Sequence, residues 1–235
     1  MSTAVMALNI ETGANLDMVD SLPPPDVKYG NTKDPLKRAT KEAEAAASQR
    51  TKMALDPHFG VVLCVGLASY SSEQRVESAV RFTSDPGEDG IAVGERGLLQ
   101  RAWKLIGKID RLVTFNGSGF DIPFMLRRSA ILGVKPDVHI ETNKYRVQKL
   151  SAPGHTDLMH VLHETETGPG LGVPRTLSFY VKQFLGEEWP SADVDQSQLA
   201  ELLTQEGGRQ QIEELCSWNV RQTLLLDRRL QGVYP

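Results

Sequence analysis

Residues 115–121 read Phe-Asn-Gly-Ser-Gly-Phe-Asp, and they join an apolar strand predicted at 112–115 to a helix predicted at 119–132. The Asn-Gly-Ser-Gly sequence is typical of a tight turn that tolerates unusual backbone angles. Asp121 then lies in the first helical turn, where unpaired amides and the helix dipole favour a carboxylate. Asp121 therefore either caps the helix or belongs to a buried site at the carboxyl end of a strand, where open α/β folds bind ligands.

Two further polar clusters interrupt apolar segments. Asn9 and Glu11 are two residues apart on a strand predicted at 4–11, so both side chains project from the same face. Asn219 falls on the apolar stripe of a helix predicted at 210–230, where a buried amide requires a hydrogen-bond partner. The alternatives are that Asn9 and Glu11 face solvent at a strand end and that Asn219 is a satisfied core residue.

The order of the predicted elements indicates the fold class. Apolar periodicity predicts strands at 4–11, 60–68, 76–82 and 112–115, and helices at 36–55, 93–109, 119–132, 157–163, 176–185 and 210–230. Three strands, a helix, a strand and further helices predict an α/β fold, with a sheet of mixed direction and helices on its faces. The length of 235 residues suits one domain, 1–235. Three consecutive prolines and an exposed helix make 16–58 a surface insertion within it.

Composition excludes some classes of protein. The formal net charge is -4, so no global basic field would hold nucleic acid over the whole surface. This does not count against an enzyme that grips phosphate locally. Cys64 and Cys216 fall inside apolar runs, which predicts buried, reduced thiols of a cytosolic protein. The longest apolar run is too short to span a bilayer, and the first residues lack a basic region followed by an apolar core, so we expect no secretory signal.

Taken in order, the three polar clusters resemble the three motifs of the DEDD family of 3′–5′ exonucleases. The matching segments are Asn9-Ile-Glu11 after an apolar run, Asn116-Gly-x-Gly-Phe-Asp121-Ile-Pro-Phe, and Cys216-x-x-Asn219-Val-x-x-Thr. Within that family, the chain is similar to phage and bacterial proteins related to the proofreading domain of B-type polymerases. The resemblance implies a ribonuclease H-like fold, with a mixed five-stranded sheet flanked by helices and a helical insertion after the first strand.

The resemblance also implies an activity and a set of site residues. The activity is removal of nucleotides from the 3′ end of single-stranded DNA by hydrolysis with two Mg²⁺ or Mn²⁺ ions. The implied catalytic and metal-binding residues are Glu11 and Asp121, which match family acids, and Asn9 and Asn219, which occupy the places of the other two acids. Asp157 is a candidate auxiliary carboxylate, with helix capping as its alternative role.

The departures from the family pattern predict a weakened or inactive nuclease. An amide oxygen can bind Mg²⁺ or Mn²⁺, but it brings no net charge and bridges ions poorly. The family's water-orienting tyrosine falls on Leu215, and its histidine variant falls on Glu214. Two origins are open: a pair of Asp→Asn changes made to trap substrate, or natural divergence, which Leu215 favours. The alternative function is a catalytically silent module that binds nucleic acid or a polymerase on the same fold.

Local basic and aromatic groups are candidates for nucleic-acid contacts. These candidates are Asn116, Phe120, Arg127, Arg128, Lys144, Arg146 and Lys149. The basic residues either bind phosphates or form a solvated charged face, and Phe120 either stacks on a base or packs in the core. The expected partners are a single-stranded DNA 3′ end and a DNA polymerase or other replication protein, with no membrane. The expected location is the cytoplasm of a bacterial cell or phage-infected host.

Overall fold

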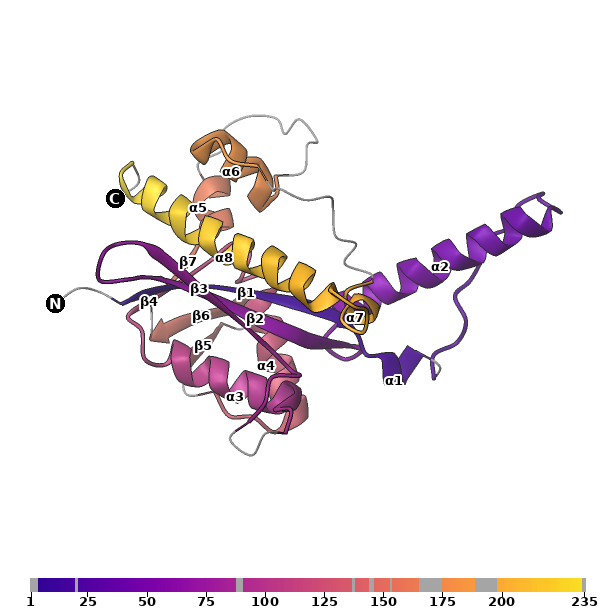
Figure 1. The fold of residues 1–235 in the computed structure, drawn as a ribbon, viewed down its shortest axis with the longest axis horizontal. Helices are drawn as coiled ribbons and strands as arrows, with labels where there is room; N and C mark the ends of the chain where they lie inside the picture. The colour runs from indigo at the N-terminus through magenta and orange to yellow at the C-terminus, as the bar shows by residue number, and fades with distance from the viewer. Residues whose placement is uncertain are drawn as a thin grey trace.

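A five-stranded sheet in the order β3-β2-β1-β4-β7 forms the centre of the molecule (Figure 1). The computed structural model describes residues 4–19, 21–87, 91–136, 138–143, 146–152, 154–164, 175–188 and 198–233. The five strands are β1 (Val5–Ala14), β2 (Gly60–Tyr70), β3 (Val76–Phe82), β4 (Arg111–Thr114) and β7 (Gly154–Asp157). The strands β1, β2 and β3 pair antiparallel, whereas β4 pairs parallel with both β1 and β7. The sheet is therefore mixed, as predicted.

Three strands were not predicted from the sequence. A helix was predicted from Asp157, but Asp157 is the last residue of β7, and α5 (Leu158–Glu164) begins after it. The strands β5 (His139–Asn143) and β6 (Arg146–Ala152) pair as a separate two-stranded sheet. A four-residue segment such as β7 carries little local signal, because its extended conformation depends on pairing with β4.

Helices cover both faces of the large sheet (Figure 1). On one face, α3 (Gly94–Ile106) and α4 (Asp121–Leu132) bury a core with Leu8, Ile10 and Trp103. On the other face, α8 (Gly208–Gln231) crosses the sheet with α6 (Leu177–Leu185) and α7 (Leu199–Leu202) nearby. Ala7 packs on this second face, so the predicted alternation along β1 is confirmed. The apolar side chains thus hold β1 between two helical layers.

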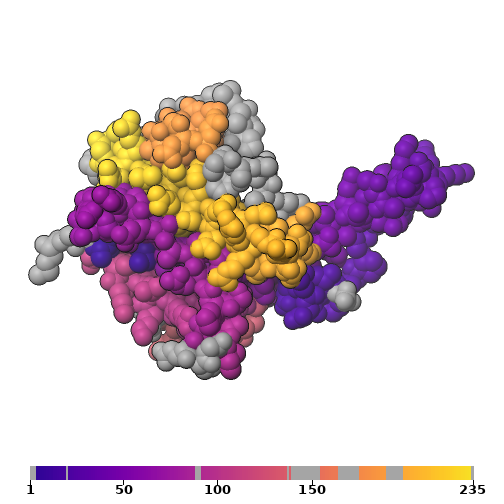
Figure 2. Space-filling view, in the orientation of Figure 1, coloured from indigo at the N-terminus to yellow at the C-terminus, as the bar shows by residue number. Residues whose placement is uncertain are grey.

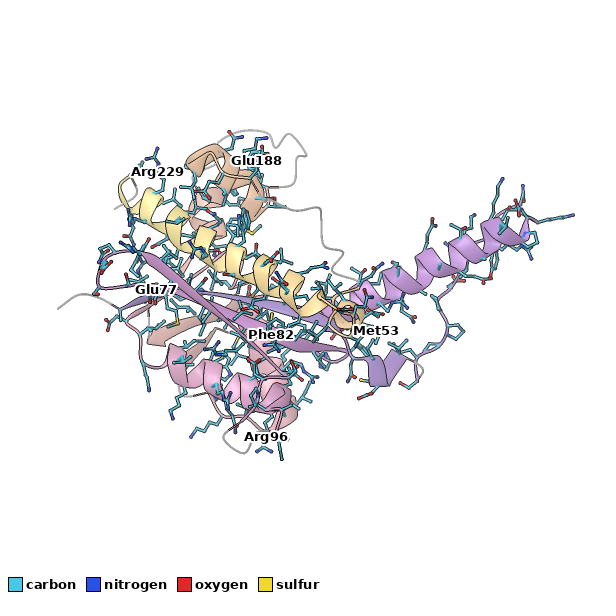
Figure 3. All side chains as sticks on the ribbon, in the orientation of Figure 1. Met53, Glu77, Phe82, Arg96, Glu188 and Arg229 are labelled. Atoms are coloured by element: carbon cyan, nitrogen blue, oxygen red, sulfur yellow. The ribbon has the colours of Figure 1, made fainter. Side chains whose placement is uncertain are left out.

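The segment between β1 and β2 forms an arm that extends away from the sheet (Figures 1 and 2). It contains α1 (Leu16–Val19) and α2 (Pro35–Leu55) within the stretch predicted as a surface insertion. The Asp34 side chain caps α2 and Pro35 begins it, as expected at a helix N-terminus. Only Met53 and Ala54 of α2 are buried, and Met53 lies where the arm meets the body (Figure 3).

None of the helices in the described ranges combines the length and the apolar character that a membrane span requires.

Candidate functional site

The carboxylate of Glu11 lies at the centre of the candidate site. Glu11 is only 5% exposed, near the end of β1. Its Oε1 atom accepts hydrogen bonds from Asn9 Nδ2 at 2.8 Å and from Asn219 Nδ2 at 3.2 Å. Asn9 projects from the same face of β1, and Asn219 comes from α8, which lies across that face. The structure therefore brings these three residues together, with both amides bound to the same carboxylate oxygen.

Asp121 joins β1 to the start of α4. Its Oδ1 atom accepts the backbone N–H of Ile10 at 2.9 Å, and its side chain is buried. The pairing of β1 with β4 extends only over Val5–Ala7, so Ile10 lies beyond the reach of β4. A buried N–H there needs an acceptor, which Asp121 supplies. Asp121 therefore does more than cap its helix, because it binds the strand that carries Glu11.

The turn that presents Asp121 depends on close backbone packing. Asn116 has a left-handed φ of 63°, a conformation that asparagine tolerates better than most residues. A Cβ atom on Gly117 would overlap the side chain of Thr114, which explains glycine at that position. The Asp157 carboxylate accepts the N–H groups of Asn116 at 2.8 Å and Ser118 at 2.9 Å. It also accepts the N–H of Met159 in the first turn of α5, so Asp157 fixes the turn and caps a helix.

Burial raises the pKa of both carboxyl groups in the site. Desolvation raises the pKa of Glu11 to about 7, against the opposing effect of the Asn9 and Asn219 hydrogen bonds, and the nearby Asp121 charge raises it further. Desolvation also raises the pKa of Asp121 to about 7, opposed by the hydrogen bond from Ile10. Near neutral pH, each group is therefore part protonated, as expected for acids that lack a cationic partner.

The donor set does not fit two divalent ions. Within the described ranges, no group of three or more His, Cys, Asp or Glu side chains is placed to hold a metal ion. Two-ion hydrolysis needs several converging carboxylates, and here Glu11 and Asp121 are the only acids at the four matched positions. The amide nitrogens of Asn9 and Asn219, which cannot ligate a cation, face Glu11 Oε1. The amides thus satisfy the carboxylate through hydrogen bonds.

A buried cysteine pair lies beneath the site. Cys64 and Cys216 are free and buried, as the sequence predicted. Asn9 Nδ2 lies 3.6 Å from Cys216 Sγ. Hydrogen bonding to Cys64 and burial raise the pKa of the Cys216 thiol, which keeps it protonated. Sequence reasoning missed the contact of Cys216 with Asn9, although its position three residues before Asn219 on the same helix was a usable signal.

The space beside Glu11 is small. A cavity of about 40 Å³ is lined by Ile10, Glu11, Thr12, Thr51, Ala54, Leu55, Phe120 and Leu199. A volume of this size holds water, so a nucleotide bound at the site would lie outside the cavity. Its walls include the last turns of α2 and the start of α7. The base of the arm therefore borders the candidate site.

The residues predicted to contact nucleic acid differ in how exposed they are. Arg128 is 6% exposed, and its guanidinium binds Glu95 at 2.6 and 2.9 Å. Its inclusion among phosphate-binding residues is therefore corrected, because a buried arginine paired with a carboxylate is not presented to a ligand. Arg127 and Asn116 are exposed, and Phe120 is half-buried against Phe124.

Three further candidates fall partly or wholly outside the described structure. Lys144 lies outside the described residues. Arg146 and Lys149 belong to the strand β6, of which the structure describes the backbone only. Their role in nucleic-acid contact stays a prediction.

Comparison with known proteins decides the family. Residues 55–233 match the model of a family described as a predicted 3′–5′ exonuclease related to the exonuclease domain of PolB. The chain belongs to this family. The matched range contains Asp121 and Asn219 and begins after Asn9 and Glu11. The assignment of β1 to the site therefore rests on the structure and not on the family match.

Two polymerases show how much of a larger protein the chain resembles. A DNA polymerase of Pyrococcus glycovorans is 26% identical in a match of length 109 that covers 42% of this chain and 14% of the polymerase. The structure of the family B DNA polymerase from the hyperthermophilic archaeon Pyrobaculum calidifontis superposes with a TM-score of 0.64 at 17% identity. That superposition covers 98% of this chain and 25% of the polymerase, so the chain spans only a quarter or less of either relative. The likeness confirms the predicted ribonuclease H-like α/β fold.

Proposed function

We propose that this chain holds the 3′ end of single-stranded DNA as an exonuclease-type protein whose metal-dependent hydrolysis is weakened or absent. The supporting observation is that both Asn9 and Asn219 donate to Glu11 Oε1. A carboxylate bound by two N–H donors has less capacity for a cation than one flanked by other carboxylates. The family supports the exonuclease type, and the amides support the loss of hydrolysis.

The magnitude of the loss follows from charge. Replacing one carboxylate by an amide about 4 Å from an ion removes about 4 kcal/mol per unit of ion charge at an effective dielectric constant of about 20. Since about 1.4 kcal/mol corresponds to tenfold, one replacement weakens ion binding or rate by about three powers of ten or more. Asn9 and Asn219 are two such replacements. Leu215 is half-buried and has no group that could orient a water molecule.

The test is degradation of a 5′-labelled single strand in Mg²⁺ and in Mn²⁺. The chain is compared with Asn9→Asp, Asn219→Asp and the double variant. We expect no ladder from the chain itself and a 3′–5′ ladder from the double variant. Gln100→Glu is the matched amide-to-acid control, since Gln100 is exposed on α3 away from the site. A ladder from the unchanged chain, at the rate of the double variant, would refute the proposal that the amides silence hydrolysis.

The alternative function is a silent module that binds nucleic acid or a polymerase. It is favoured if the double variant also gives no ladder, because the loss of hydrolysis would then lie in Leu215, which cannot orient a water molecule, and not in the two amides. Thermal unfolding with Mn²⁺ separates the two functions: the double variant gains stability if it has regained an ion site, whereas a silent module shows little shift. A polymerase or replication partner and a cytoplasmic location, in a bacterial cell or phage-infected host, belong to the same proposal.

A further inference from the structure

The free end of the arm carries a basic cluster in an otherwise acidic chain. Between Lys28 and Lys41 there are five basic residues and one acid, a net charge of +4, whereas the whole chain has -4. We call this stretch, Lys28–Lys41, the arm tip. Its basic residues are Lys28, Lys33, Lys37, Arg38 and Lys41. The positive charge is therefore concentrated on the part of the molecule that extends furthest from the sheet (Figures 1 and 2).

Specific contacts hold the arm tip together. Lys41 Nζ donates to the carbonyl oxygens of Lys28 at 3.3 Å and Tyr29 at 3.1 Å. Arg38 Nε donates to the carbonyl oxygen of Thr32 at 3.1 Å, and its guanidinium lies 5.1 Å from the centre of the Tyr29 ring. These bonds fold the segment before α2 back against the first turns of the helix. The basic groups are thus gathered at one end.

Acidic residues flank the arm tip, but three of its lysines have no ion-pair partner among the described residues. Lys28, Lys33 and Lys37 are exposed and form no ion pair within the described part of the chain. Asp34 binds the N–H of Leu36 as the helix cap. Like charges four residues apart on a helix, such as Lys37 and Lys41, cost a few tenths of a kcal/mol each. An anionic partner would remove this cost.

The base of the arm borders the candidate site. Thr51, Ala54 and Leu55 of α2 line the cavity beside Glu11. Lys37 lies fourteen residues before Thr51 on the same helix, which corresponds to about 21 Å at about 1.5 Å per residue. A stacked nucleic-acid strand advances about 3.4 Å per nucleotide, so about six nucleotides span this distance.

We propose that the arm tip binds the phosphates of a single-stranded nucleic acid about six nucleotides upstream of a 3′ end held at the candidate site. This rests on the proposed function, because that function supplies the strand and places its end. An acidic protein would also suit the charge. The path from the cavity along α2 to the arm tip favours a strand, which would contact both ends of that path.

The test is fluorescence anisotropy with labelled single strands of about three and about twenty nucleotides, in EDTA to prevent cleavage; the shorter strand is too short to reach from the site to the arm tip. The variant Lys28→Ala/Lys33→Ala/Lys37→Ala removes three exposed charges and leaves the Lys41 and Arg38 contacts intact. Its matched control is Arg101→Ala/Lys104→Ala/Lys108→Ala, three exposed positions on or just after α3. Melting temperatures near that of the unchanged chain show that both variants fold.

We expect the arm-tip variant, and not the control variant, to bind the longer strand with a weaker salt dependence. Three lost phosphate contacts reduce the slope of log affinity against log salt by about 2, since each contact contributes about 0.7 for single strands. Between about 50 and 200 mM salt, the affinity of the unchanged chain then falls about sixteenfold further than that of the variant. The shorter strand should show no such difference.

Each other outcome decides between the two proposals. An unchanged slope in the arm-tip variant, or a longer strand that binds no more tightly than the shorter one, overturns the arm inference and leaves the proposed function standing. Equal, arm-dependent binding of a circular strand supports the arm tip and refutes end binding at the site. Absence of binding to any strand overturns both. Arm-dependent binding of poly-glutamate in that case identifies an acidic protein as the partner.

Discussion

Replacement of the central carboxylate, Glu11→Gln, is expected to stabilise the protein at alkaline pH and to flatten its pH dependence. Burial is the main reason that the pKa of Glu11 rises from 4.5 to about 7. The folded state therefore favours the protonated form, and ionisation of Glu11 acts against folding. Glutamine keeps the shape and an acceptor oxygen for the amides of Asn9 and Asn219, while it removes the buried charge.

The size of the effect follows from linkage. A rise in pKa from 4.5 to about 7 corresponds to about 3 kcal/mol. Because the folded pKa lies above the unfolded one, this stability is fully present below about pH 4.5 and is lost as the pH rises through about 7. Burial also raises the pKa of Asp121 to about 7, so ionisation of Asp121 contributes its own loss of stability in the same pH range. The variant should therefore retain part of the loss.

Urea unfolding followed by circular dichroism, at about pH 5 and pH 8 in EDTA, measures the effect. We expect Glu11→Gln to be similar to the unchanged protein at the lower pH and about 1–3 kcal/mol more stable at the higher pH. Glu77→Gln is the control, because Glu77 is exposed on β3 (Figure 3). If the Gln variant were less stable at pH 8, or kept the full pH dependence, burial would not be the dominant effect on Glu11.

Three further substitutions test the packing of the site. Asn219→Ala removes a donor to Glu11, so the free energy of unfolding in urea should fall by about 1 kcal/mol at pH 8 and by less at pH 5. An equal fall at both pH values would show that the amide does not stabilise the ionised carboxylate. Arg128→Ala removes the cationic partner of Glu95, which keeps only the N–H of Val62, and should cost about 3–5 kcal/mol. The salt slope for DNA should not change; a surface phosphate contact would show the reverse. Gly117→Ala should reduce the free energy of unfolding by about 1–3 kcal/mol and lower the melting temperature by several degrees. An unchanged melting temperature would contradict the close packing of the turn.

Local patterns were sufficient for much of the fold and for the approximate site. Alternation along residues 4–11 placed Asn9 and Glu11 on one face, and helical spacing placed Asn219 on the buried stripe. The Asn-Gly-Ser-Gly turn placed Asp121 at the start of a helix. These predictions succeeded because the repeat of a strand or a helix is a property of the local backbone, so it appears in the spacing of apolar residues along the sequence.

Partners across the chain were decided only by the tertiary structure. Arg128 has the same local pattern as its exposed neighbour Arg127, and only the position of Glu95 on α3 makes it a buried ion pair. The strand β7 exists because β4 offers it an edge. The amide of Asn219 donates to Glu11 only because α8 crosses β1, although the two residues are more than two hundred positions apart in sequence. Periodicity specifies the direction of a side chain, whereas the identity of the group it meets depends on long-range packing.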